Sequence, residues 1–172
     1  MKVITARLDP KSIAEAINEI LEYQKEVERK ARLLVERLTD FGADIVRIRI
    51  IGFGAVDSGE LLSSVDGYYS PHLNAGYVRV TSDHAAFVEF GTGVVGLMNS
   101  HSNGEYLAKA AWQYNVGAKI FTTKDGRVGW IYPTDDGGFR FTDGMASRPF
   151  MYETALGIQR IFPMIAKDVF ST

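Results

Sequence analysis

The feature that most constrains the fold is a long run of helical signals near the N-terminus. Asp9 precedes Pro10, a pair typical of a helix start, because the acid caps the first turn and proline lacks only an N–H that has no helical acceptor there. The next glycine is Gly42, so we predict one helix from about Pro10 to Thr39 (1–40 with its lead-in). Its apolar positions alternate spacings of four and three: Ile13, Ile17, Ile20, Val27, Ala31, Leu34 and Leu38, with Gln24 in the remaining place.

Two kinds of partner could cover this narrow stripe. The simpler expectation is the sheet of the chain's own domain. The alternative is a neighbouring subunit, because a helix of this length extends about 45 Å, which exceeds a small core. Charged residues occupy the other faces, acidic first and basic later, in the order that complements the helix dipole.

The middle of the chain predicts short strands separated by turns. Residues 44–51 (DIVRIRII) alternate apolar and charged residues and therefore predict a half-buried strand. Residues 85–90 are apolar apart from Glu89. Further strands are expected at 77–80, 119–123, 129–132 and 139–142.

The C-terminal part predicts a second helix over 148–170. It follows Pro149, with Ser147 or Arg148 as its cap, and Pro163 should kink it. The order helix, strands, helix predicts an α+β fold in which both helices pack on one face of a mostly antiparallel sheet. The 172 residues fit a single domain, with the sheet over 43–142, a mobile polar loop near 94–104 and a short helix over 105–114.

Composition excludes several classes of function. The formal charge is −2, from 19 basic and 21 acidic residues, so no summed positive field attracts nucleic acid. There is no cysteine, which excludes disulfides and thiolate chemistry. We see no signal peptide and no run of about 18 apolar residues, so we expect a soluble protein made in the cytoplasm.

The residues offer no recognisable catalytic or metal-binding pattern. His72, His84 and His101 lack the spacing of helical metal ligands, and Ser58 lacks the Gly-x-Ser-x-Gly setting of a nucleophile. The glycines do not form a phosphate-binding fingerprint. We therefore expect no metal, no cofactor and no enzyme, and keep as an alternative a hydrolase that uses Glu89 with His84 or His101.

A second alternative is a nucleic-acid or peptide-binding module. Basic residues interleaved with aromatic residues on one sheet face are typical of a single-strand platform. The candidates here are Arg47, Arg49, Arg79, Lys119, Lys124, Arg127 and Arg140, with Phe121, Trp130 and Phe139.

Three segments stand out in order: DSGELLSSV at 57–65, HAAFVEFGTG at 84–93 and GMASRPFMYETA at 144–155. Together they resemble the tail-completion or neck family of long-tailed bacteriophages and prophages, whose members are minor tail or head-tail joining proteins. The matching residues are Ser58, Gly59, Leu61, Ser64, Ala85, Val88, Glu89, Phe90, Gly91, Thr92, Ala146, Pro149, Phe150 and Ala155, with Arg148 before the proline. His84 stands where the family usually has tyrosine, and residues 95–142 form a longer, more strand-rich connection than usual.

The resemblance implies a structural, non-enzymatic protein of the virion, present in the host cytoplasm during assembly. It implies a ring, a hexamer if it follows the symmetry of the tail, between the head connector or head-closure proteins and the tail-tube protein. DNA would only pass through this ring. The near-neutral charge is compatible with a lumen to which DNA does not adhere.

Physical chemistry assigns scaffold roles to the same segments. Ser58 can cap a short helix over 59–65, Phe150 can plug the core, and Gly91 can turn the chain where a side chain would clash. For Glu89, we hypothesise a structural carboxylate. It would accept hydrogen bonds from backbone N–H groups, or from an arginine such as Arg148, and so fix the turn against the last helix.

Overall fold

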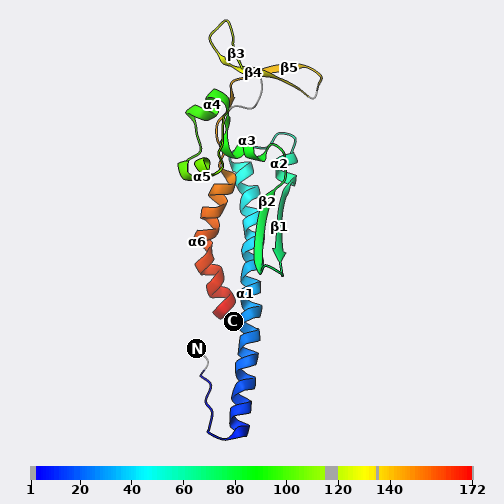
Figure 1. The fold of residues 1–172 in the computed structure, drawn as a ribbon. Coiled ribbons are helices and arrows are strands. Elements are labelled where there is room, and N and C mark those ends of the chain that lie inside the picture. Colours follow the sequence, from blue (N-terminus) through cyan, green and yellow to red (C-terminus); the bar gives the residue numbers. More distant parts are fainter. Residues whose placement is uncertain (1–2, 115–119, 135, 172) are drawn as a thin grey trace.

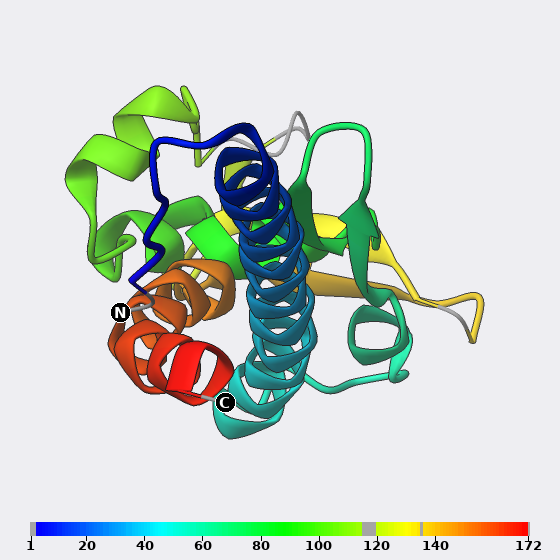
Figure 2. The ribbon, with the colours of Figure 1, turned by 90° about the horizontal axis from the view of Figure 1, so that it is seen from below.

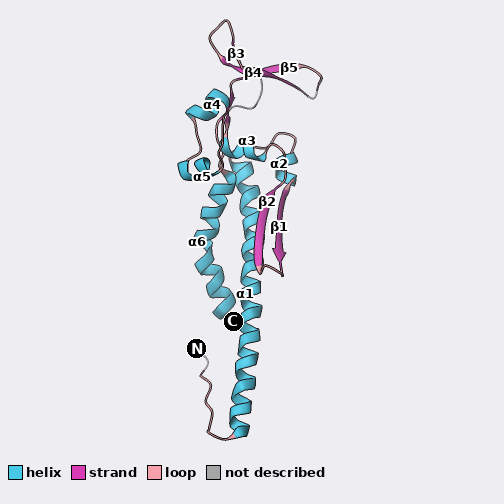
Figure 3. Cartoon of the chain, viewed as in Figure 1, coloured by secondary structure: helices cyan, strands magenta, loops and turns pink. Residues whose placement is uncertain are grey.

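The computed structural model describes residues 3–114, 120–134 and 136–171. It confirms the α+β class, with a long N-terminal helix, a C-terminal helix and antiparallel sheets (Figures 1 and 3). The molecule is elongated along the N-terminal helix, α1, which spans Pro10–Gly52. Viewed along this axis, the other elements lie around α1 (Figure 2).

The start of α1 is as expected, and its end is not. Asp9 caps the helix by accepting a hydrogen bond from the Ser12 N–H at 2.9 Å. However, α1 runs through Gly42 to Gly52. A Cβ at Gly42 would lie 2.9 Å from the side chain of Val78, so this glycine permits close packing within the helix and does not end it.

The predicted strand over 44–51 is therefore wrong, because these residues form the last turns of α1. Their apolar residues fit both the two-residue period of a strand and the 3.6-residue period of a helix. In the helix, Val46 and Ile50 are four residues apart on one buried face, and neither is exposed to solvent. The burial of Val46 and Ile50 in the tertiary structure therefore favours a helix over a strand for these residues.

The strands form two separate sheets, not the single sheet that was predicted. β1 (Val65–Ser70) and β2 (Ala75–Val80) pair as an antiparallel hairpin that packs along α1. β3 (Phe121–Thr122), β4 (Val128–Pro133) and β5 (Phe139–Thr142) form an antiparallel sheet beyond the end of α1 (Figure 1). The predicted strands at 77–80, 129–132 and 139–142 are thus confirmed, and residue 119 lies outside the described residues.

Among the described residues of the region predicted as sheet there are four short helices. They are α2 (Glu60–Ser63), α3 (Ala85–Phe90), α4 (Gly93–Met98) and α5 (Gly104–Lys109). α4 and α5 lie within or beside the segment expected to be a mobile loop. The short strand β6 (Gly144–Met145) then leads toward the last helix.

The C-terminal helix, α6, spans Phe150–Ser171 and continues through Pro163. Its axis bends along its length, but the helix stays one element (Figure 1). α6 packs against α1, and the two helices and the hairpin share a core that includes Val46, Ile50 and Phe150. Among the described residues, no helix combines the length and apolar character needed to cross a membrane.

Candidate functional site

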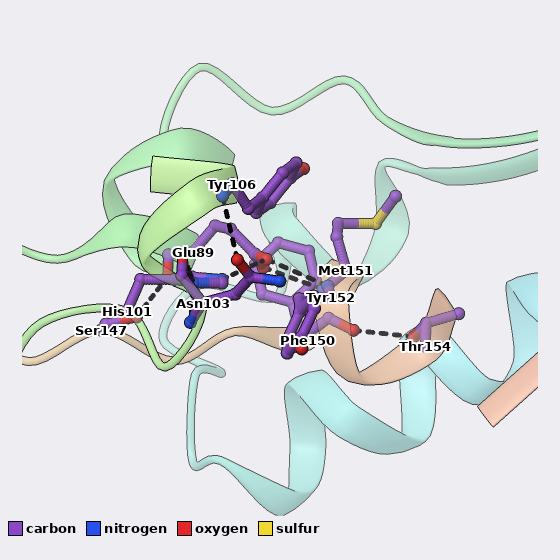
Figure 4. Close-up of polar contacts among 9 residues, drawn as sticks. All are labelled: Glu89, His101, Asn103, Tyr106, Ser147, Phe150, Met151, Tyr152 and Thr154. Atoms are coloured by element: carbon purple, nitrogen blue, oxygen red, sulfur yellow. Dashed lines mark hydrogen bonds and ion pairs between the residues drawn. The ribbon is translucent and has the colours of Figure 1, made fainter. Parts of the chain in front are cut away.

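The three segments identified in the sequence meet in one place. Leu61 from the first, Val88 from the second and Phe150 from the third belong to a single buried cluster, together with the end of α1. Phe150 is fully buried, which confirms its expected role in the core. This junction is the candidate functional site (Figure 4).

Glu89 is the centre of the junction. It lies near the end of α3 and is only 3% exposed. Its carboxylate oxygens accept the backbone N–H groups of Met151 at 2.8 Å and Tyr152 at 3.0 Å, in the first turn of α6 (Figure 4). The first N–H groups of a helix have no helical acceptor, and a negative charge there also complements the helix dipole. Glu89 therefore caps α6 from another helix, and this confirms the backbone alternative of the sequence hypothesis.

Arg148, the other suggested partner, ties the junction together through other atoms than the Glu89 carboxylate. Its guanidinium donates to the carbonyl of Gly54 at 3.3 Å, and its backbone N–H donates to the carbonyl of Val88 at 2.8 Å. Ser147 is not the cap of α6 either, because the helix begins at Phe150; its hydroxyl donates to the backbone carbonyl of Glu89 at 2.6 Å. The chain before α6 is thus tied to α3 by both backbone and side chain.

His101, which the sequence paired with Glu89 only in the hydrolase alternative, is the other partner of this carboxylate. Its side chain is fully buried, and its Nε2 lies 3.3 Å from a Glu89 oxygen. Its Nδ1 accepts the backbone N–H of Asn103 at 3.0 Å. Because Nδ1 is an acceptor, the neutral ring carries its proton on Nε2 and donates it to Glu89.

Aromatic rings enclose this pair. The His101 ring lies 5.2–5.5 Å from the ring centres of Phe90, Tyr106 and Tyr152. Residue 101 was expected in a mobile loop, yet it is buried between α3, α5 and α6, so that expectation is wrong at this position. Asn103 also caps α5 by accepting the Tyr106 N–H.

Burial governs the electrostatics of the site. Removal from water raises the pKa of Glu89 above its ordinary value, and the hydrogen bonds from Met151, Tyr152 and His101 oppose this effect. The pKa of Tyr106 is raised as well, first by burial and then by the nearby carboxylate of Glu89.

The polar atoms of Glu89 and His101 are taken up by contacts within the protein. Both carboxylate oxygens and both ring nitrogens have protein partners, and the two side chains are 4% and 0% exposed. His84, the other histidine considered for a hydrolase, lies on the surface before α3. Within the described ranges, no group of three or more acidic or histidine side chains could hold a metal ion.

The turn after α3 depends on glycine. Gly91 has φ of 81°, and a Cβ there would lie 2.8 Å from the Ser147 nitrogen and 2.9 Å from the Met145 carbonyl oxygen. This confirms the expected clash. The following residue, Thr92, is buried and its hydroxyl accepts the Met145 N–H at 3.2 Å.

The first segment supports the junction from the other side. The helix is shorter than predicted: α2 covers only 60–63, Gly59 is its N-cap with φ of 87°, and Val65 already starts β1. The Ser58 hydroxyl accepts the Glu60 N–H at 3.3 Å, and Leu61 is buried. Ser64 accepts the Thr81 N–H through its carbonyl, which joins α2 to the end of β2.

The basic residues considered for nucleic acid do not form one platform. Arg47 and Arg49 lie on α1 and Arg79 on β2, whereas Arg140 lies on β5 and Arg127 in the connection between β3 and β4. Most are paired with acids, as Arg79 is with Asp66 at 2.9 Å and Arg127 with Asp143 at 3.1 Å. Lys119 lies outside the described residues.

Comparisons with known proteins add no relative. No protein-family model, curated protein or solved structure matches the chain.

Sequence reasoning missed Asn103 and the donors on Met151 and Tyr152, and it named His101 only for a hydrolase and not as a buried structural partner of Glu89. A lone histidine in a polar segment carries no signal of burial, and backbone N–H groups carry none at all. A polar residue such as Asn103 before a short helical pattern was the one available sign, because asparagine is a frequent N-cap.

Proposed function

We propose that this protein is a structural component of a tailed-phage virion, a neck or tail-completion protein at the head-tail interface. It forms or joins a ring that connects the head connector to the tail tube. The proposal combines the resemblance of the three segments with a property of the fold: the chain has far more surface than a protein that works alone.

The accessible surface carries the proposal. It is 11828 Å² for a chain of 19.1 kDa, whereas a compact monomer of that mass exposes about 8,400 Å². Large apolar side chains contribute to it along α1, on α6 and on the three-stranded sheet. Extended, apolar surface of this extent is typical of subunits that bury it against others.

The junction around Glu89 supports the same function. A buried carboxylate that caps one helix from another fixes the relative position of the two helices, as a scaffold requires. Assembly proteins need such fixed geometry, because a ring closes only if each contact repeats the same rotation.

Mass measurement and electron microscopy of the purified protein test the proposal. With the tail-tube protein encoded in the same genome, we expect ring-shaped oligomers or a stable complex. A matched sample with an unrelated tail-tube protein should give no complex. A protein that stays monomeric in both mixtures and binds oligonucleotides in a salt-sensitive way would instead support the binding-module alternative.

A further inference from the structure

The apolar stripe of α1 continues along most of the helix, and we call it the α1 seam. It consists of Ile13, Ile17, Ile20, Gln24, Val27, Ala31, Leu34, Leu38, Phe41 and Ile45, which are spaced by four and three residues in turn. Residues three and four apart lie on one side of a helix, so these positions share one face.

α6 covers only the upper part of the α1 seam. At one end Arg49 lies 3.9 Å from Glu153, and at the other Arg37 pairs with Asp168. Between them, Ile45 faces Gly157. α6 therefore runs antiparallel to α1 and ends partway along it, and the lower part of α1 extends beyond (Figure 1).

The lower part of the α1 seam is bare. Ile13, Ile17, Ile20 and Val27 are 37–52% exposed. Residues 3–9 turn back beside the helix (Figure 1), but Val3 and Leu8 are 79% and 103% exposed and the apolar positions of α1 stay exposed beside them. Most helical stability in proteins comes from tertiary packing of an amphipathic face, and this apolar face is left largely exposed to water.

Charge along this free part is arranged in two blocks. Residues 11–22 hold one lysine and three glutamates, a net charge of −2. Residues 23–33 hold four basic and two acidic residues, a net charge of +2. In an antiparallel pair, the negative block of one copy lies beside the positive block of the other. In a parallel pair in register, blocks of the same charge lie side by side and repel each other.

We propose that the lower α1 seam binds the same segment of a second copy, antiparallel and about a two-fold axis near Glu22. The heptad positions then form layers of Ile13 on Ala31, Ile17 on Val27, and Ile20 on Gln24. The second copy would thus pack antiparallel against the lower part of α1, as α6 does against the upper part. A two-fold contact closes on itself, so this pairing goes beyond the proposed ring and does not depend on it.

The absence of cysteine allows a direct test by disulfide cross-linking of the full chain. The variants are Ile17→Cys, Val27→Cys and, as the control on another face of the helix, Asn18→Cys. In the antiparallel pair, the two copies of position 17 are about 15 Å apart, too far for a disulfide. We expect about tenfold more cross-linked product in the equal mixture of Ile17→Cys and Val27→Cys than in either variant alone.

Each other outcome overturns the proposal. Efficient cross-linking of Ile17→Cys with itself indicates a parallel pair. No cross-link above the Asn18→Cys level in any sample shows that the segment does not pair with a second copy. Circular dichroism of each variant checks that the fold is kept, which we expect because the three positions lie outside the core.

The result is independent of the test of the ring. Binding to tail-tube protein without the mixed cross-link would overturn the two-fold contact and leave the proposed function standing. The mixed cross-link without binding to tail-tube protein would support the two-fold contact and overturn the proposed function.

Discussion

The carboxylate of Glu89 accepts the backbone N–H of Met151 at 2.8 Å, across 62 residues of chain. With the second bond, to Tyr152, it satisfies the start of a 22-residue helix from an element that lies far away in sequence. This side chain therefore adds to the bonds of Ser147 and Arg148 that hold the end of α3 against the beginning of α6.

Glu89→Gln should destabilise the protein. An amide presents one acceptor oxygen and one NH₂ group, so at least one N–H donor of the site loses its acceptor, at a cost of about 1–3 kcal/mol. Denaturant unfolding followed by circular dichroism measures the change. Glu105→Gln, an exposed position, is the control and should change the free energy of unfolding by less than about 0.5 kcal/mol. Equal stability of the wild type and Glu89→Gln would contradict the capping role.

The contribution of Glu89 should depend on pH. Its pKa is raised in the folded protein, so as pH rises the unfolded chain loses this proton before the folded chain does. The stability that the side chain contributes is complete below its unfolded pKa and is lost as pH rises through the folded pKa. The free energy difference between the wild type and Glu89→Gln should therefore be larger near pH 4 than near pH 8. A difference that grows with pH would show that the hydrogen bonds outweigh burial.

His101→Ala should loosen the connection between α4 and α5. The change removes a buried ring that contacts three aromatic side chains and takes the acceptor from the Asn103 N–H, at a cost of about 2–4 kcal/mol. Hydrogen exchange should accelerate at Asn103 and Tyr106. His84→Ala, on the surface, is the matched control and should leave both rates unchanged. Unaltered exchange in His101→Ala would mean that other contacts hold this segment.

A comparison of Gly91→Ala with Gly126→Ala distinguishes the cost of backbone strain from the cost of a steric clash. The two glycines have φ of 81° and 85°, but only Gly91 has backbone atoms within 3 Å of a built Cβ, and Gly126 has open space. Gly126→Ala should cost about 1 kcal/mol from strain alone. Gly91→Ala should cost more, by at least about 1–3 kcal/mol, or fail to fold. Thermal unfolding of both variants measures this, and equal costs would show that the turn relaxes around the new methyl group.

The sequence was sufficient for elements whose signals are local. Asp9 and Pro10 marked the start of α1, and residues 139–142 marked β5, because caps and short β-rich runs are visible in neighbouring residues. The segments that form the junction were recognised as well, with Glu89 correctly interpreted as an acceptor of backbone N–H groups.

The failures arose where distant contacts decide the structure. Gly42 looked like a helix end but lies inside α1, because its missing side chain makes room for Val78. Residues 44–51 fit a strand in isolation and become helix because Val46 and Ile50 enter the shared core. His101 joined Glu89 only through the folding of α3, α4 and α5, which no spacing in the sequence announces.

Because α1 is long and packed at one end only, a small change of its angle there moves its other end much further. Its 43 residues span about 65 Å, and its upper turns are clamped between α6 and the β1–β2 hairpin, whereas its lower turns are free. The free part is about 20 residues or about 30 Å long, so a tilt of about 5° where it leaves the clamp displaces the tip near Pro10 by about 3 Å. The stiffness of the α1–α6 packing therefore sets how accurately the far tip of the molecule can be aimed.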